Sequence, residues 1–170
     1  MTYDKAFEML IGHEGGFTNN AKDPGNWTGG KVGVGICKGT KFGIAAKSYP
    51  ELDIKNLTLI DAKAIYKRDF WDKCRTDFLP DCVRFDIFDA AVNSGVLQAG
   101  KFVQQAAGLT GKDVDGHVGP TTLKAVEKMD PQTLDKRISG YRLRFMASLA
   151  IWPDFGRGWA NRIANNLIED

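Results

Sequence analysis

Residues 81–94 read DCVRFDIFDAAVNS, and this stretch decides the fold. Its apolar side chains surround a helical axis on almost every side: Val83, Phe85, Ile87, Phe88, Ala90, Ala91 and Val92. A helix that is apolar all round is buried in a core, whereas a surface helix keeps one polar face. Gly95 follows the stretch, and a glycine commonly ends a helix. The stretch therefore predicts a central, buried helix against which other elements pack.

Helical patterns extend outward from this stretch in both directions. Helices are expected in six further segments: residues 3–13, 58–70, 97–107, 120–128, 131–152 and 158–167. Thr58 and Asp61 form a capping box of the looser kind at the start of the second segment. Asp130 and Pro131 supply an N-cap and a first helical position for the fifth. Most of the chain is therefore predicted to be α-helical.

The segment of residues 18–44 has no helical pattern. Residues 18–30 are rich in asparagine, aspartate and glycine, a composition typical of turns. Residues 32–36 read VGVGI, an alternation that predicts a short, weak strand, and Lys41–Ile44 is its expected partner. We therefore expect a mainly α (α+β) fold, a helical bundle with a small β-hairpin element near the N-terminus.

Size and composition limit the function classes. The 170 residues suit one domain or two small lobes that share a core, and the net charge of +2 is too small to indicate a nucleic-acid binder. No apolar run approaches the length of a membrane span, and Met1–Lys5 lack the apolar core of a signal peptide. The three cysteines have no CxxC spacing, and with only two histidines a zinc site lacks ligands. We expect a protein made in a reducing cytoplasm without a signal peptide, needing no metal or organic cofactor.

Two acids stand close together near the N-terminus. Residues 13–17 read HEGGF and residues 23–28 read DPGNWT, so Glu14 precedes Asp23 by nine positions. Glu14 continues the apolar stripe of its helix, and the glycines after it leave room for a ligand to approach the backbone. Partial burial would raise the pKa of Glu14 and keep it protonated as a general acid. Glycoside hydrolysis needs such an acid together with a second carboxylate.

The other candidate site residues each have a structural alternative. Asp23 is the expected second carboxylate, ionised in polar surroundings, although Asp-Pro-Gly is also a common turn. Thr28 either holds a water through its hydroxyl or is an ordinary loop threonine. Trp27 is the best candidate for stacking on a sugar ring. Asn93 either bonds a sugar acetamido group or ties down a neighbouring loop.

Two rival motifs stand in the wrong context. Gly25 and Gly30-Lys31 have the spacing of a phosphate-binding loop, but no apolar strand precedes them. Residues 113–116 resemble a fragment of a calcium loop, but the first and last ligand positions of that loop would lack carboxylates. The other tryptophans are expected in the core: Trp71, Trp152 and Trp159. Two arginine pairs are expected on solvated helix faces: Arg142 with Arg144, and Arg157 with Arg162.

At these residues the chain resembles glycoside hydrolase family 108, the lysozyme-like muramidases of phage endolysins and prophages. The resemblance to the N-terminal part of that family rests on Glu14–Phe17, the Asp23–Thr28 loop, Lys41–Ile44, Tyr66 and Phe70–Asp72. The peptidoglycan-binding segment that follows in the family resembles this chain at Asp89, Val92–Gly95, Gln104, Asp115–Gly119, Gly158, Trp159 and Arg162.

The resemblance implies a lysozyme-like fold and cleavage of the bond between N-acetylmuramic acid and N-acetylglucosamine in peptidoglycan. The family's catalytic glutamate falls on Glu14. Asp23 has the spacing of the second acid in phage lysozymes of another family, and Thr28 falls one residue short of their threonine. We expect a single lysozyme-like domain, with the catalytic acid and the β element in a lobe of residues 1–95. A helical lobe of residues 96–170 is expected to resemble a peptidoglycan-binding segment.

The resemblance and the composition together imply a monomer that acts on peptidoglycan in the periplasm and does not bind nucleic acid. Three other functions stay open. A lytic transglycosylase acts on the same bond with one acid and without water. A peptidoglycan-binding module would have no activity, and a nucleic-acid binder would show an affinity that falls steeply with salt.

Overall fold

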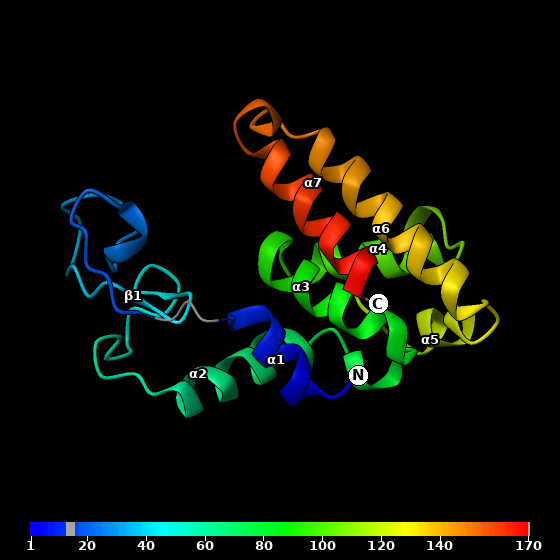
Figure 1. Cartoon of the computed structure of the whole chain (residues 1–170), viewed down its shortest axis with the longest axis horizontal. Helices are drawn as coiled ribbons and strands as arrows, with labels where there is room; N and C mark the ends of the chain where they lie inside the picture. Colours follow the sequence, from blue (N-terminus) through cyan, green and yellow to red (C-terminus); the bar gives the residue numbers. More distant parts are fainter. Residues whose placement is uncertain (13–15, 170) are drawn as a thin grey trace. The chain divides into compact units, whose positions relative to one another are not determined.

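The computed structural model describes residues 1–12 and 16–169, the side chain of residue 169 excepted. The α-helices of the described part are α1 (Tyr3–Ile11), α2 (Leu59–Tyr66), α3 (Arg84–Ser94), α4 (Val96–Ala106), α5 (Pro120–Val126), α6 (Pro131–Ala147) and α7 (Trp152–Glu169) (Figure 1). Two short strands, β1 (Thr40–Lys41) and β2 (Ile44–Ala45), form an antiparallel sheet. The predicted mainly α class with a small N-terminal β-hairpin is confirmed.

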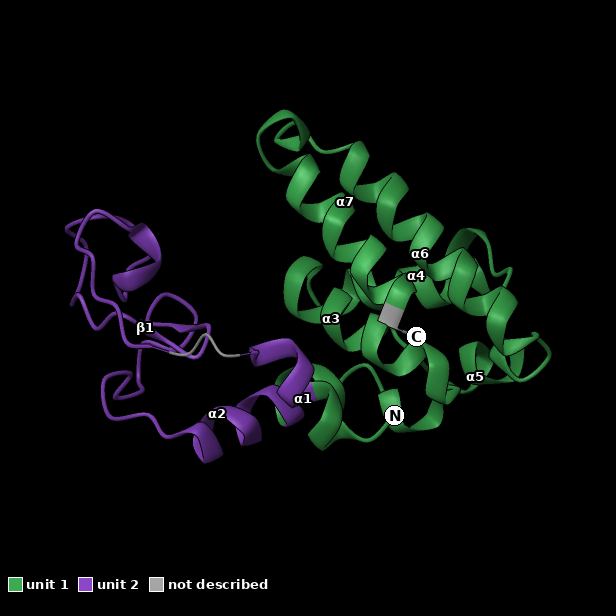
Figure 2. Cartoon of the chain, in the orientation of Figure 1, with its two compact units in different colours: residues 1–6, 68–170 green, residues 7–67 purple. Residues whose placement is uncertain are grey.

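The chain divides into two compact units (Figure 2). We call residues 1–6 and 68–170 the helical unit and residues 7–67 the hairpin unit. The boundary crosses α1, whose first residues belong to the helical unit and whose later residues belong to the hairpin unit.

The helical unit is built around α3. Its residues Phe85–Ala91 are all buried, as the apolar stretch predicted, and the helix ends at Gly95, which has a φ of +90°. Helix α3 contacts α4 and α6, while α4 also packs against α5, and α6 against α7. The predicted central helix is therefore confirmed.

An aromatic cluster joins the start of the chain to this core. Tyr3 lies edge-on to Trp71 and Phe88, with ring centroids 5.3 and 5.7 Å away. Trp71 is fully buried, in agreement with the prediction, and is reached through a π-helical turn of residues 67–71 that continues α2. The core of the helical unit therefore includes a side chain from the N-terminal segment of residues 1–6.

The predicted helix starts are confirmed at two caps and revised at a third. Thr58 and Asp61 form the reciprocal capping box before α2. The Asp130 carboxylate accepts a hydrogen bond from the Thr133 backbone N–H at the start of α6. Helix α7 begins at Trp152 rather than near residue 158, because Pro153 falls in the first turn, where a backbone N–H has no helical acceptor.

The hairpin unit contains a two-residue turn between β1 and β2. Phe42 and Gly43 have φ of +50° and +73°, the combination of a type I′ turn, which matches the twist of paired strands. The Tyr66 hydroxyl donates a hydrogen bond to the Phe42 carbonyl at 3.1 Å, which joins the turn to α2. The segment Lys41–Ile44 therefore forms most of a hairpin by itself.

The strand predicted at residues 32–36 is wrong. Val32, Val34 and Ile36 are 55, 48 and 64% exposed, and the segment forms turns. Gly33 and Gly35 have φ of +80° and +82°, which carries the backbone out of the extended conformation after each valine. The alternation of valine and glycine therefore reflects a turning loop rather than a pleated strand.

Candidate active site

The predicted general acid, Glu14, lies outside the described residues, as does His13. On one side of it, α1 ends at Ile11 and is followed by Gly12, which has a φ of +55°. On the other side, Phe17 is 37% exposed, and Thr18 forms an isolated antiparallel bridge with Thr40. The residues before Glu14 thus belong to α1, and Thr18, which follows it, pairs with Thr40 of the hairpin.

Two cavities of the hairpin unit contain residues that flank this point of the chain. One, of about 380 Å³, is lined by Phe7, Glu8, Ile11, Gly12, Leu59 and Lys63. The other, of about 370 Å³, is lined by Phe17, Asn19, Cys37, Lys38, Glu51, Asp53, Ile54 and Lys55. The first is mainly apolar, whereas the second combines an aromatic ring with charged groups of both signs. The residues just before and just after positions 13–15 therefore line concave surfaces.

Asp23 caps a 3₁₀ turn of residues Pro24–Asn26. Its Oδ1 accepts a hydrogen bond from the Gly25 N–H at 2.8 Å, which confirms the turn-forming alternative. The side chain is exposed, and Oδ2 has no partner among the described residues. The carboxylate is therefore held in place by one oxygen while the other faces solvent, so the turn does not prevent a chemical role.

Trp27 and Thr28 follow in the same loop and are held by the loop itself. The Trp27 indole N–H donates to the Ala21 carbonyl at 2.9 Å, and its ring is half-buried. The Thr28 Oγ1 accepts the Ile36 N–H at 2.9 Å, and a Cβ on Gly35 would lie only 2.2 Å from that oxygen. Thr28 is therefore a structural residue of the loop whose hydroxyl proton stays available to an acceptor.

Sequence reasoning missed Asn26, the fully buried polar residue of this loop. Its amide nitrogen donates to the Asn20 carbonyl at 3.0 Å, and its Oδ1 accepts the Thr40 hydroxyl at 2.6 Å. Its backbone carbonyl accepts the Gly39 N–H at 3.1 Å. A buried amide needs partners for all of these groups. Asn26 thus fastens the Asp23 loop to β1, but in the sequence it looks like one more turn asparagine.

Asn93 belongs to the helical unit, whereas Asp23, Trp27 and Thr28 belong to the hairpin unit. Asn93 is exposed near the end of α3, and its side chain makes no hydrogen bond with another described residue. The alternative that it ties down a neighbouring loop is therefore not supported. The structure brings the three loop residues together, whereas Asn93 lies at an exposed position of the helical unit.

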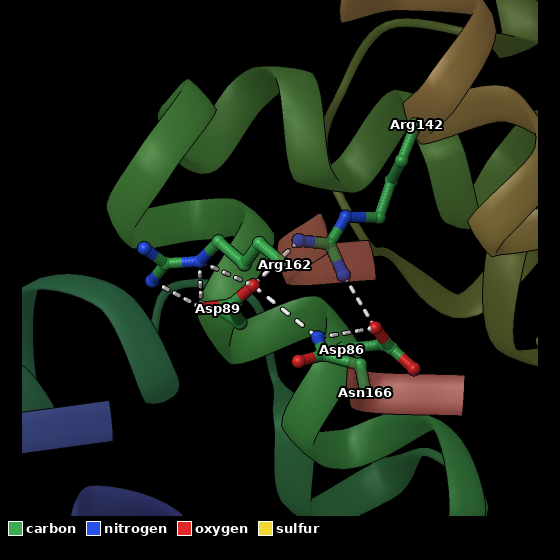
Figure 3. A network of polar contacts seen from close by, with 5 residues as sticks. All are labelled: Asp86, Asp89, Arg142, Arg162 and Asn166. Atoms are coloured by element: carbon green, nitrogen blue, oxygen red, sulfur yellow. Dashed lines mark hydrogen bonds and ion pairs between the residues drawn. The ribbon is translucent and has the colours of Figure 1, made fainter. Parts of the chain in front are cut away.

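A buried charge network lies among α3, α6 and α7 (Figure 3). Arg142 is fully buried and pairs with Asp86 through one guanidinium nitrogen and with Asp89 through the other, at 2.6 Å. Arg162 Nε donates to Asp89 Oδ1 at 2.8 Å, and the Asn166 amide donates to Asp86 Oδ1 at 2.9 Å. The solvated position predicted for Arg142 is therefore wrong, whereas the Arg162 side chain is 41% exposed and reaches Asp89 from the edge of the network.

The network changes the titration of Asp89. Burial by itself raises the pKa of this carboxyl, but the hydrogen bonds and positive charge of Arg162 and Arg142 outweigh burial and lower the pKa below its ordinary value of 3.8. The spacing of Arg142 from the buried residues Ile138 and Met146, four positions on either side, was a signal that the arginine lies on the core face of α6.

A second buried polar group, Gln104 on α4, holds the Asp115-Gly116 turn. Its Nε2 donates to Asp115 Oδ1 at 2.7 Å, and its Oε1 accepts the Gly116 N–H at 2.8 Å. A Cβ on Gly100 would lie 2.0 Å from the Gly116 carbonyl oxygen, so the turn packs directly on α4. The segment that resembled a calcium loop is therefore a turn anchored by a glutamine. Among the described residues no group of histidines, cysteines and acids could hold a metal.

Comparison with known proteins is consistent with this architecture. Residues 7–95 match the family Glycosyl hydrolase 108, and residues 98–164 match the family Predicted Peptidoglycan domain. Ten solved chains are similar. One is a structure of Brucella abortus SagA, with 30% sequence identity, a TM-score of 0.77, and coverage of 96% of this chain and 90% of that one. No curated protein matches.

The glycosyl hydrolase match covers 89 residues, more than half of the chain, and contains the Asp23 loop, the β-hairpin and α3. The second match contains Gln104 with the turn that it holds, Arg142, and the aromatic first half of α7. None of the described helices combines the length and the apolar composition of a membrane span. The chain is a peptidoglycan hydrolase, and it belongs to glycosyl hydrolase family 108.

Proposed function

We propose that the chain is an N-acetylmuramidase, which hydrolyses the bond between N-acetylmuramic acid and N-acetylglucosamine. The observation that supports this proposal is that the residues matching the glycosyl hydrolase family include Glu14 and, nine positions later, a carboxylate with one oxygen open to solvent, Asp23. A pair of carboxyl groups is what glycoside hydrolysis requires.

In this proposal Glu14 donates its proton to the glycosidic oxygen as the bond to the anomeric carbon breaks. The free oxygen of Asp23 either stabilises the developing positive charge on the sugar or orients the water that attacks it. The Thr28 hydroxyl proton is available to that water, because its oxygen lone pair already accepts the Ile36 N–H. Water then supplies the hydroxyl of the new sugar end, and its proton returns the acid to its starting state.

The two lobes expected from the sequence would divide the work in the same proposal. Residues 1–95 would carry the acids and the hairpin, and residues 96–170 would hold the polymer, together as a single lysozyme-like domain. Trp27 of the hairpin unit and Asn93 of the helical unit are the proposed contacts to the sugar. A protein of this kind lyses bacterial walls, so an endolysin-type role in phage release and an antimicrobial effect belong to the proposal, as does its action as a monomer.

Digestion of purified peptidoglycan followed by mass spectrometry of the fragments tests the proposal. The expected products end in reducing N-acetylmuramic acid. Glu14→Gln is expected to lose nearly all activity and to keep its far-ultraviolet circular dichroism, because the amide cannot supply the proton. Glu127→Gln, on an exposed position of the helical unit, is the matched control and is expected to digest normally.

Other product patterns would contradict the proposal in distinct ways. Anhydromuramic ends would show a lytic transglycosylase, for which Asp23→Asn would be nearly harmless. Reducing N-acetylglucosamine ends would show cleavage of the other glycosidic bond. Full activity of Glu14→Gln would exclude Glu14 as the acid.

A further inference from the structure

The first half of α7 carries three aromatic side chains on an incompletely covered surface. Phe155 is 55% exposed and lies stacked on Trp159, with ring centroids 5.8 Å apart and planes 24° apart. Trp159 in turn contacts Trp152, with centroids 6.2 Å apart, and both indoles are only half-buried. We call Trp152, Phe155 and Trp159 the aromatic platform. The sequence predicted both tryptophans in the core, and their partial exposure corrects that prediction.

The platform is rigidly supported although it is exposed. A Cβ on Gly156 would lie 2.5 Å from the Trp152 ring, so this indole packs directly on the helix backbone. Further along α7, the helix is anchored by the buried side chain of Ile163 and by the hydrogen bond from Arg162 to Asp89. Helix α6 runs alongside α7 (Figure 1). Aromatic rings that are fixed before binding lose little conformational entropy when a ligand stacks on them.

Polar side chains are interspersed with the platform along α7, where Asp154, Arg157 and Asn161 are exposed. A peptidoglycan strand combines sugar rings, whose C–H faces stack on aromatic rings, with peptides that carry carboxylates. Clustered exposed apolar side chains among polar ones are typical of ligand surfaces.

The position of the platform in the chain identifies its occupant. All three aromatic residues lie within residues 98–164, the match to the Predicted Peptidoglycan domain. Ile168, which is on the same helix and 80% exposed, lies outside that match. From the stacked rings, their exposure and the match, we infer that Trp152, Phe155 and Trp159 bind the glycan strand of peptidoglycan by stacking. This inference deepens the proposed function, since it concerns the same polymer at a surface remote in sequence from Glu14.

Sedimentation of the full chain with purified peptidoglycan sacculi tests the inference. All proteins carry Glu14→Gln so that cleavage does not remove the binding partner. Phe155→Ala is expected to weaken binding about tenfold, a usual cost for removing a central aromatic contact. Phe155→Tyr keeps the ring and is expected to bind like its parent, whereas Phe155→Leu keeps apolar area without a ring and is expected to bind weakly. Ile168→Ala is the matched control and is expected to bind normally.

The outcomes separate this inference from the proposed function. Sedimentation in the Glu14→Gln background does not depend on cleavage, and Ile168→Ala with Glu14 intact is expected to digest sacculi normally, so wall binding and catalysis are measured independently. Normal sedimentation of Phe155→Ala, or of Phe155→Leu, would overturn the stacking inference. It would also be overturned if phospholipid vesicles, but not sacculi, bound the parent and lost that binding on Phe155→Ala, since the platform would then contact lipid.

Discussion

At the scale of single residues, Arg142 illustrates how a charge becomes part of a core. Its guanidinium has no solvent exposure and is neutralised by Asp86 and Asp89, one helical turn apart on α3. The Asn166 side-chain amide donates hydrogen bonds to both of these carboxylates. Such a network contributes little net stability over an apolar core, but removing one member leaves buried charges without a partner.

Replacing Arg142 with alanine is therefore expected to lower the free energy of unfolding by about 3–5 kcal/mol, as measured by urea denaturation. Arg144→Ala is the control, because it removes an arginine side chain from an exposed position two residues away. It is expected to change the free energy of unfolding by less than about 0.5 kcal/mol. Equal effects of the two substitutions would show that the network does not stabilise the helical unit.

The same network predicts a dependence of stability on pH. Because the pKa of Asp89 is lowered in the folded protein, its charged form stabilises the fold above its ordinary pKa of 3.8. That contribution is lost as the pH falls from there through the folded pKa. We therefore expect the stability difference between the wild type and Asp89→Asn to be largest near neutral pH and to shrink below pH 3.8, as followed by urea denaturation at a series of pH values. A difference that is constant with pH would contradict this.

At the scale of elements, the helices use glycine in two opposite ways. In α6, a Cβ added to Gly140 would meet nothing within 4 Å, and the position is exposed. In α4, Gly100 is buried, and a Cβ there would lie 2.0 Å from the Gly116 carbonyl oxygen. The first glycine only weakens its helix, whereas the second allows the Gln104-held turn to pack against α4.

Substituting each of these glycines with alanine is expected to have opposite effects on thermal stability. Gly140→Ala is expected to stabilise the protein by about 0.5–1 kcal/mol, because alanine loses less conformational entropy in a helix. Gly100→Ala is expected to destabilise it by about 1–3 kcal/mol through overpacking. The melting temperatures of the two variants are measured by calorimetry under the same conditions, so that each variant is the control for the other. A change of melting temperature with the same sign in both variants would contradict the packing explanation.

At the scale of the whole molecule, the helical unit is discontinuous in sequence, since residues 1–6 belong with residues 68–170. Tyr3 supplies the contact, with its ring against Trp71 and Phe88. Residues 7–67, which form the hairpin unit, are therefore inserted between two segments of the helical unit. The central helix α3 thus depends on a side chain that precedes it by about 80 residues.

Tyr3→Ala is accordingly expected to destabilise the helical unit by about 3 kcal/mol, the order of cost for deleting a buried aromatic side chain. Hydrogen exchange should become faster in α3, far along the chain from the substitution. Lys5→Ala, at an exposed position of the same helix, is expected to leave exchange in α3 unchanged. Unaltered exchange in Tyr3→Ala would mean that the N-terminal segment is not part of that core.

The sequence by itself determined the local features: the buried α3, the caps at Thr58 and Asp130, and the turning character of the Asp23 loop. Each depends on residues within about one helical turn, so spacing and residue type are sufficient to predict it. The strand expected at residues 32–36 failed because period-two alternation leaves glycine's turning conformations open, and only a paired partner strand excludes them. Glu14 and Asp23 were likewise proposed from their residue types and spacing.

Only the tertiary structure decided which polar groups are buried. Arg142 meets carboxylates 53 and 56 positions earlier, and Asn26 meets a hydroxyl 14 positions later. The exposure of the aromatic platform depends in the same way on which neighbours cover α7. A polar or aromatic side chain is stable in the core only when distant partners satisfy it and cover it. The burial of a polar or aromatic side chain is therefore a property of the assembled fold, whereas the burial of an all-apolar helix can be predicted from its own segment.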